Sequence, residues 1–292
     1  MRLHSVGKAD TGRLLSGDPR LYEPVAARVS PDGRQVAVLG YGDEEFIGSV
    51  AIVSMTGALR TRVLASSREK SYGTPYGRGT LGWLSASELL VYRTTYTGTG
   101  GPGEFVREAL VVDVPTMRTR VLARDVGLES ANVVPGKGFL LLTRTGENAR
   151  VEFLDKDGAT RTPVAAGRAA EVAPDGGTAA VWGFTASDDA ANTTSLRLVP
   201  LPSGTPSRTV DLPPGDLVEV AWSPVSNRLL AVVESSGESD ETTRRAFVVR
   251  VPGGAVAELA LTDYASGGGW SPDGTRLLYT TGSGEVSVVQ VP

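Results

Sequence analysis

Cysteine is absent from the 292 residues, which excludes disulfides and thiolate metal sites. Histidine occurs once, as His4, so a multi-histidine metal centre is excluded and a serine–histidine–aspartate triad would have one possible base. Lysine occurs only at Lys8, Lys70, Lys137 and Lys156, and arginine supplies the other basic residues. This bias is typical of a high-GC, actinobacterium-like bacterial composition and says little about function.

Long apolar runs are also missing, because no stretch approaches the roughly 18 apolar residues of a membrane span. The start, Met1–Gly7, lacks the basic-then-apolar pattern of a signal peptide. We therefore expect no direct membrane insertion. An extracytoplasmic location is favoured if a targeting segment precedes the chain, and a cytoplasmic one otherwise.

Charge of one sign is not in excess, since the net charge is −4 and the isoelectric point about 5.3. Such a balance exerts no general attraction on nucleic acid, so no nucleic-acid partner is predicted. The chain has no Gly-x-Ser-x-Gly elbow, no P-loop and no Asp-x-Asp-x-Asp-Gly calcium loop. We expect no catalytic residues, no metal and no cofactor, and hence a protein that is not an enzyme.

Glycine and proline are plentiful, with 36 and 18 residues, and they punctuate apolar runs along the whole chain. One short pattern recurs six times, and one of its positions is always Val or Trp. These marker positions are Val29, Trp83, Val133, Val172, Trp222 and Trp270. Their separations of 54, 50, 39, 50 and 48 residues are close to the roughly 40–50 residues of a four-stranded propeller blade.

Each copy reads as a strand, a turn and further strands, with turns such as Ser30–Gly33, Pro174–Gly176 and Ser271–Gly274. The pattern predicts an all-β fold, a six-bladed β-propeller of four-stranded antiparallel blades in one domain over residues 1–292. The predicted blades cover about 23–67, 74–125, 128–167, 168–214, 215–261, and 262–292 plus 11–16. In this scheme the ring is closed by an N-terminal strand, Thr11–Ser16, beside Val286–Val291. Seven blades, with Leu3–Val6 in another blade, is the alternative.

The stretch Trp270-Ser271-Pro272-Asp273-Gly274-Thr275-Arg276-Leu277-Leu278 resembles the repeat of TolB-like, WD-repeat-related bacterial β-propellers. The resemblance covers nearly the whole chain and is weakest at the second and third copies. It implies the propeller fold and a usual role as a protein-interaction platform, often outside the cytoplasm. It does not imply a shared ligand.

Two sets of residues have a structural explanation that competes with a functional one. Asp32, Asp175 and Asp273 look like repeated metal ligands, but their place in the turns already explains them. The tryptophans Trp83, Trp222 and Trp270 look like a stacking platform, but they occupy the position that packs between blades. We therefore assign both sets to the structure.

Five connections are longer than turns require: Gly40–Gly48, Ser66–Gly79, Arg93–Glu108, Gly183–Thr194 and Glu234–Arg245. In a propeller such links emerge on one face, which we call the long-loop face, and loops on a rigid scaffold are where binding surfaces occur. The candidate binding residues on this face are Tyr41, Asp43, Glu44, Phe46, Tyr72, Tyr76, Tyr96, Phe105 and Phe184. Solvated loops with incidental aromatic residues would give the same pattern.

Polar residues near the markers suggest the lining of the central channel. These are Arg28, Thr80, Asn132, Glu171 and Glu219. A water-filled channel would have the same composition. A carboxylate and amide metal site of the kind found in some lactonase propellers can be drawn from Asn132 and Glu171, but no spacing singles it out.

Three functions remain open on the sequence. The first is a monomeric scaffold, not an enzyme, that binds a protein or peptide on the long-loop face. The second is a metal-assisted propeller enzyme of the lactonase or lyase type, with carboxylates at the channel mouth. The third is a sensor domain that binds a small molecule or glycan.

Overall fold

The structure is a computed structural model, and it describes residues 2–3, 13–14, 23–41, 48–55, 61–64, 70–72, 81–96, 105–145, 148–183, 195–205, 207–225, 227–236, 242–251, 253–261 and 264–292. All regular elements in these ranges are strands. The described residues therefore contain no helix that could cross a membrane. The chain divides into two compact units, residues 1–131 and 132–292.

Unit 1 contains two large antiparallel sheets and one short strand pair. The first sheet runs β3-β4-β5-β6, with bounds Glu23–Val29, Gln35–Tyr41, Gly48–Ser54 and Thr61–Leu64. In the second sheet β11 (Arg118–Asp125), β10 (Phe105–Asp113) and β9 (Glu88–Tyr96) are followed by β7 (Lys70–Tyr72) and β8 (Leu81–Trp83), which both pair with β9. The short pair is β1 (Arg2–Leu3) with β2 (Arg13–Leu14).

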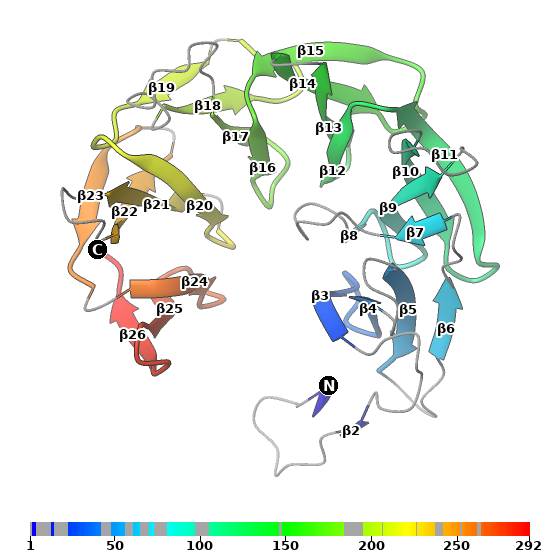
Figure 1. Cartoon of the computed structure of the whole chain (residues 1–292), viewed down its shortest axis with the longest axis horizontal. Coiled ribbons are helices and arrows are strands. Elements are labelled where there is room, and N and C mark those ends of the chain that lie inside the picture. The colour runs from blue at the N-terminus through cyan, green and yellow to red at the C-terminus, as the bar shows by residue number, and fades with distance from the viewer. Residues whose placement is uncertain are drawn as a thin grey trace. The chain divides into compact units, whose positions relative to one another are not determined.

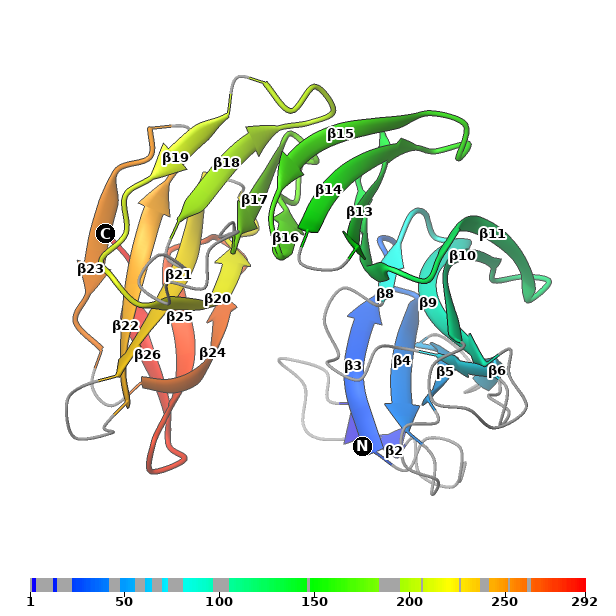
Figure 2. The ribbon, with the colours of Figure 1, turned by 45° about the horizontal axis from the view of Figure 1, so that its top comes forward.

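Unit 2 contains four consecutive antiparallel sheets. The first sheet is β12 (Leu128–Val134, beginning in unit 1), β13 (Gly138–Thr145), β14 (Asn148–Asp155) and β15 (Arg161–Ala166). The next is β16 (Ala169–Val172), β17 (Thr178–Trp182), β18 (Leu196–Pro200) and β19 (Arg208–Val210). Then come β20 (Asp216–Trp222), β21 (Arg228–Ser236), β22 (Thr242–Arg250) and β23 (Val256–Leu259), which Figure 2 shows side by side.

The last sheet has three described strands, β24 (Tyr264–Trp270), β25 (Arg276–Thr281) and β26 (Val286–Gln290) (Figure 1). With it the chain has six successive blade sheets, and the predicted fold class of a six-bladed β-propeller is confirmed. The described pairing of β2 is with β1. Closure of the ring by Thr11–Ser16 therefore stays a prediction, as does the single domain.

The middle strands of a blade are apolar on both faces because another blade packs against each face. In β21, Leu229, Ala231 and Val233 join a cluster with residues of β17 and β18. The alternate residues Leu230 and Val232 join a second cluster with β24 and β25. This explains the continuous apolar run in the sequence, where a sheet with one solvated face would alternate.

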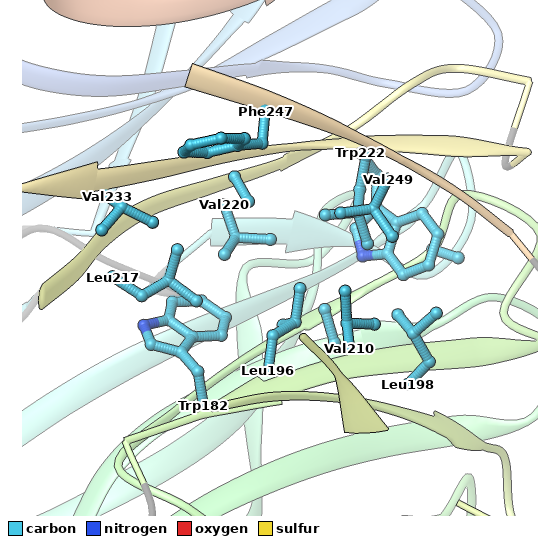
Figure 3. Close-up of a cluster of buried hydrophobic side chains, with 14 residues drawn as sticks. Trp182, Leu196, Leu198, Val210, Leu217, Val220, Trp222, Val233, Phe247 and Val249 are labelled. Atoms are coloured by element: carbon cyan, nitrogen blue, oxygen red, sulfur yellow. The ribbon is translucent and has the colours of Figure 1, made fainter. Parts of the chain in front are cut away.

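The tryptophan markers lie between blades, as predicted for Trp222. Figure 3 shows Trp222 in one buried cluster with Trp182, Leu196 and Val220. Its indole Nε1 also donates a hydrogen bond to the carbonyl of Glu171, 3.3 Å away in the preceding blade.

Two further tryptophans repeat this bond. Trp83 Nε1 donates to the Arg28 carbonyl at 2.8 Å, and Trp270 Nε1 donates to the Ala221 carbonyl at 3.0 Å. In every case the acceptor is the residue before the marker of the preceding copy. The marker of the first copy differs from these three tryptophans, since Val29 is 62% exposed.

The turn motifs form as the sequence predicts. In the last copy Ser271 Oγ donates to Asp273 Oδ1 at 2.6 Å, and the Thr275 amide donates to the same oxygen at 3.1 Å. Gly274 has φ +67°, and a Cβ there would collide with the Ser223 side chain of the preceding blade. Glycine is thus required both by the turn and by the close approach of the neighbouring turn.

Candidate functional site

The long-loop face is only partly within the described residues. Asp43, Glu44, Phe46, Tyr76 and Phe184 lie outside them, as does the channel residue Thr80. Tyr41 and Tyr96 are the last residues of β4 and β9.

Tyr72 is the clearest correction among the predicted binding residues. The link Ser66–Gly79 contains the strand β7, which pairs with the end of β9. Tyr72 is buried and packs in the cluster between the two sheets of unit 1, near Leu39 and Leu81. Its ring therefore belongs to the core and is not an anchor for a partner.

The connection between β9 and β10 is shorter than the predicted link Arg93–Glu108. The two strands continue their pairing to Tyr96 and Phe105, and Arg93 and Glu108 are direct cross-strand partners. The β-branched residues Thr94, Thr95 and Val106 favour this extension of the hairpin. The same holds for Glu234–Arg245, where β21 runs to Ser236 and β22 starts at Thr242.

A buried charge row crosses the second blade at this point. Glu108 on β10 is 1% exposed. Its Oε2 accepts from Arg93 Nε and Nη2 of β9 at 2.8 and 2.6 Å, and its Oε1 lies 3.1 Å from Arg124 Nε of β11. Thr95 Oγ1 contributes a fourth contact at 3.3 Å. Both carboxylate oxygens are therefore satisfied, and the row ties three strands together below the end of the hairpin.

We call the first three residues of β10, Phe105, Val106 and Arg107, the hairpin end. The Arg107 guanidinium lies over the Phe105 ring, 4.6 Å from its centroid. All three residues are half-buried. Tyr92 and Arg107 both donate to the Leu128 carbonyl, the Tyr92 hydroxyl at 2.6 Å and Arg107 Nη1 at 3.4 Å. Burial raises the pKa of the Tyr92 hydroxyl. The hairpin end thus carries an aromatic ring and a cation on a fixed backbone.

Three of the predicted channel residues make bonds between blades or within a strand. Arg28 and Glu171 accept tryptophan N–H groups through their carbonyls. Asn132 Nδ2 donates to the Ala170 carbonyl at 3.3 Å. These bonds join neighbouring first strands. The Asn132 side chain therefore has a structural role, whereas the bonds to Arg28 and Glu171 use backbone carbonyls and do not depend on their side chains.

Glu219 takes part in a tyrosine–carboxylate pair that sequence reasoning missed. Tyr264 at the start of β24 donates its hydroxyl to Glu219 Oε2 at 2.7 Å. The Tyr264 ring stacks on Tyr279, with centroids 5.7 Å apart, and both tyrosines are buried. Burial, and then the bond to Glu219, raise the pKa of Tyr264, so its hydroxyl keeps its proton at neutral pH. No spacing in the sequence signals this pair, because its members lie on different blades.

Arg244 adds a cation near this pair. It donates from Nε to Glu234 Oε2 at 2.6 Å, and its charge acts on Tyr264 against the effects of burial and Glu219. Together Glu219, Tyr264, Arg244 and Glu234 make a mixed acidic and basic group in unit 2.

The aspartates of the turns are held as turn residues. Hydrogen bonds from the Ser271 hydroxyl and the Thr275 amide lower the pKa of Asp273 to about 2. The Ser30 hydroxyl lowers the pKa of Asp32 in the same way, and Asp175 accepts from the Gly177 amide. Within the described ranges no group of three or more His, Cys, Asp or Glu side chains is arranged to hold a metal ion.

Among the comparisons with known proteins, only the comparison of structures finds matches to this chain. No family model matches the sequence, and no curated protein matches it. Among solved structures, an oligogalacturonate lyase in complex with manganese is 14% identical with a TM-score of 0.67, covering 91% of this chain and 76% of the lyase. TolB from Acinetobacter baumannii is 16% identical with a TM-score of 0.55, covering 90% of this chain and 60% of TolB. An acylaminoacyl peptidase from Pyrococcus horikoshii is 11% identical with a TM-score of 0.63, covering 92% of this chain and 45% of the peptidase.

At these identities the similarity shows the fold alone, a β-propeller. It also corrects one prediction. The expectation that the chain is not an enzyme rested on a propeller without a recognised catalytic motif. It is contradicted, because the similar structures include a lyase and a peptidase, which are enzymes that contain this fold.

Proposed function

We propose that this chain is a TolB-like propeller that binds a protein or peptide, and that the hairpin end of its second blade is part of the binding surface. The observation that carries the proposal is the half-buried Phe105 ring covered by the Arg107 guanidinium. Aromatic residues and arginine are the residue types enriched at the centres of protein interfaces, where a few side chains supply most of the affinity.

The rigidity of the hairpin end supports the same function. The buried Glu108, with Arg93 and the exposed Arg124 on either side, fixes the three strands directly below it. A side chain that is already positioned loses little conformational entropy when a partner binds. The similarity to TolB in fold is consistent with this function.

The test is the double variant Phe105→Ala and Arg107→Ala. We expect the variant to weaken binding of the captured partner by about 2 kcal/mol, roughly thirtyfold in Kd, since both anchors are removed. The thermal melting temperature should change little, because both side chains are only half-buried. The wild-type chain first captures the partner from the native host, and biolayer interferometry then compares Kd values.

Met55→Ala is the matched control, because Met55 is an exposed apolar residue beside the turn at Arg34, after the end of β5. It should leave the affinity unchanged. If Met55→Ala abolishes capture while the double variant still binds, the proposed surface is wrong.

We propose a lyase-type propeller enzyme as a second candidate, favoured by the tyrosine–carboxylate pair of Tyr264 and Glu219. The fold similarity to a lyase in complex with manganese supports testing this pair first with oligogalacturonate. We expect unsaturated product from oligogalacturonate, and a loss of about 100-fold in rate for Glu219→Gln. The exposed variant Glu258→Gln is the control. Activity that Glu219→Gln leaves intact, or no turnover of oligogalacturonate, contradicts this candidate.

A further inference from the structure

The outer strand of the second blade differs from the outer strands of the other blades. β11 has eight residues and no proline. The outer strands β6, β19 and β23 have four, three and four residues, and the six-residue β15 contains Pro163. Proteins usually blunt exposed sheet edges by shortening them or by inserting proline. Among the described blades, β11 is the outer edge to which neither of these two devices applies, and its pairing with β10 is interrupted by one register shift between Ala109 and Leu110.

The edge of β11 is open in the part of the chain that the structure describes, where β11 pairs with β10 alone. Its first four residues, Arg118 to Val121, are all exposed, and Val121 is 50% exposed. Within the described residues, an added strand would find backbone groups of β11 that face away from β10. β-Strand addition is an established mode of peptide recognition in which the backbone supplies affinity and alternate side chains supply specificity.

The arginines of β11 indicate which side chains an added strand would carry. Arg118 lies opposite Asp113 of β10, and Arg124 lies 3.1 Å from the buried carboxylate of Glu108. Arg120, in contrast, lies opposite the buried apolar residue Val111, so no acidic residue faces it across the strand pair. A carboxylate on the added strand would complement Arg120, and an apolar side chain would cover Val121.

The same charges argue against a second copy of this chain as the added strand. Two β11 strands side by side would bring arginines against arginines, and like charges opposite each other destabilise a strand pair. The occupant that fits both the backbone edge and its charge is an acidic, extended segment of another protein.

We propose that the edge of β11 binds an acidic extended peptide of a partner protein by β-strand addition, with Arg120 pairing with a carboxylate and Val121 with an apolar side chain. This surface is separate from the hairpin end, so the proposal goes beyond the function given above. Its test does not depend on the outcome at Phe105 and Arg107.

The probe is a fluorescein-labelled heptapeptide of alternating Glu and Val, measured by fluorescence anisotropy against the full chain. We expect Arg120→Glu to weaken binding by about tenfold or more, because a complementary charge becomes a repulsive one. Arg34→Glu, at an exposed arginine in the turn after β3, is the control and should change binding little. Circular dichroism should show both variants folded, since both arginines are exposed.

Backbone pairing is tested with two peptides that are N-methylated on alternate amides. Methylation of one set should reduce binding about tenfold, and methylation of the other set should not, because only alternate amides face a neighbouring strand. Equal binding of both methylated peptides, or of a peptide with a central proline, would overturn strand addition in favour of simple charge attraction. Absence of binding, or a dimer of the chain that Arg120→Glu dissociates in sedimentation, overturns the proposal as well.

Discussion

Replacing Trp222 with alanine is expected to lower the free energy of unfolding by about 3–5 kcal/mol, the usual cost of truncating a large buried aromatic residue. Trp222 is 8% exposed and fills the cluster between two blades together with Leu198, Leu229 and Val249. Truncation leaves a cavity in this cluster and removes the donor to the Glu171 carbonyl. Urea denaturation of the wild type and the variant measures the difference.

Two matched variants separate packing from hydrogen bonding. Trp222→Phe keeps most of the apolar volume and loses the N–H donor, so a smaller loss is expected. Trp83→Ala removes the corresponding indole in unit 1, where the side chain is only half-buried, and should also cost less. A loss below about 1 kcal/mol for Trp222→Ala would show that this ring does not hold the blades together.

Replacing Glu108 with alanine is expected to cost about 3–5 kcal/mol, because it leaves the charge of Arg93 without its partner in a buried place. The Arg93 side chain is 15% exposed, and it makes two of its hydrogen bonds to Glu108. Thermal and urea denaturation at neutral pH should show the loss.

Arg124 provides the control for this row, since its side chain is 61% exposed although it contacts the same carboxylate. Arg124→Ala should cost less than about 1 kcal/mol, as solvent screens an exposed charge. If Glu108→Ala and Arg124→Ala lower the free energy of unfolding equally, the buried ion pair of Arg93 and Glu108 is not the main contribution of this row to stability.

Local sequence predicted those parts of the fold that are set by local chemistry. Ser271 to Gly274 form their turn because the hydroxyl, carboxylate and positive-φ glycine needed for it are all within four residues. The periodic markers gave the number of blades, and they predicted the burial of Trp222. These features depend on contacts close in sequence or on a repeat that recurs along the chain.

The long connections were predicted poorly because strand length depends on pairing across the hairpin. Arg93 and Glu108 look like loop residues in isolation, since charged residues are uncommon inside strands. They are paired within the sheet because each neutralises the other, with Arg124 on the third strand. Tyr72 lies in a long link and looked like an exposed loop aromatic. It is buried because the short strand β7 in that link pairs with β9.

By itself the sequence determined an all-β propeller and favoured six blades over seven, because the repeat of short strands is written in its own pattern. Only the tertiary structure decided which polar residues act together. The pair of Tyr264 and Glu219 joins two blades that meet only after folding, and the outer edge of β11 has no further strand beside it among the described residues. Residues 45 positions apart that share one hydrogen bond leave no periodic trace, so candidate sites on this fold come from its packing.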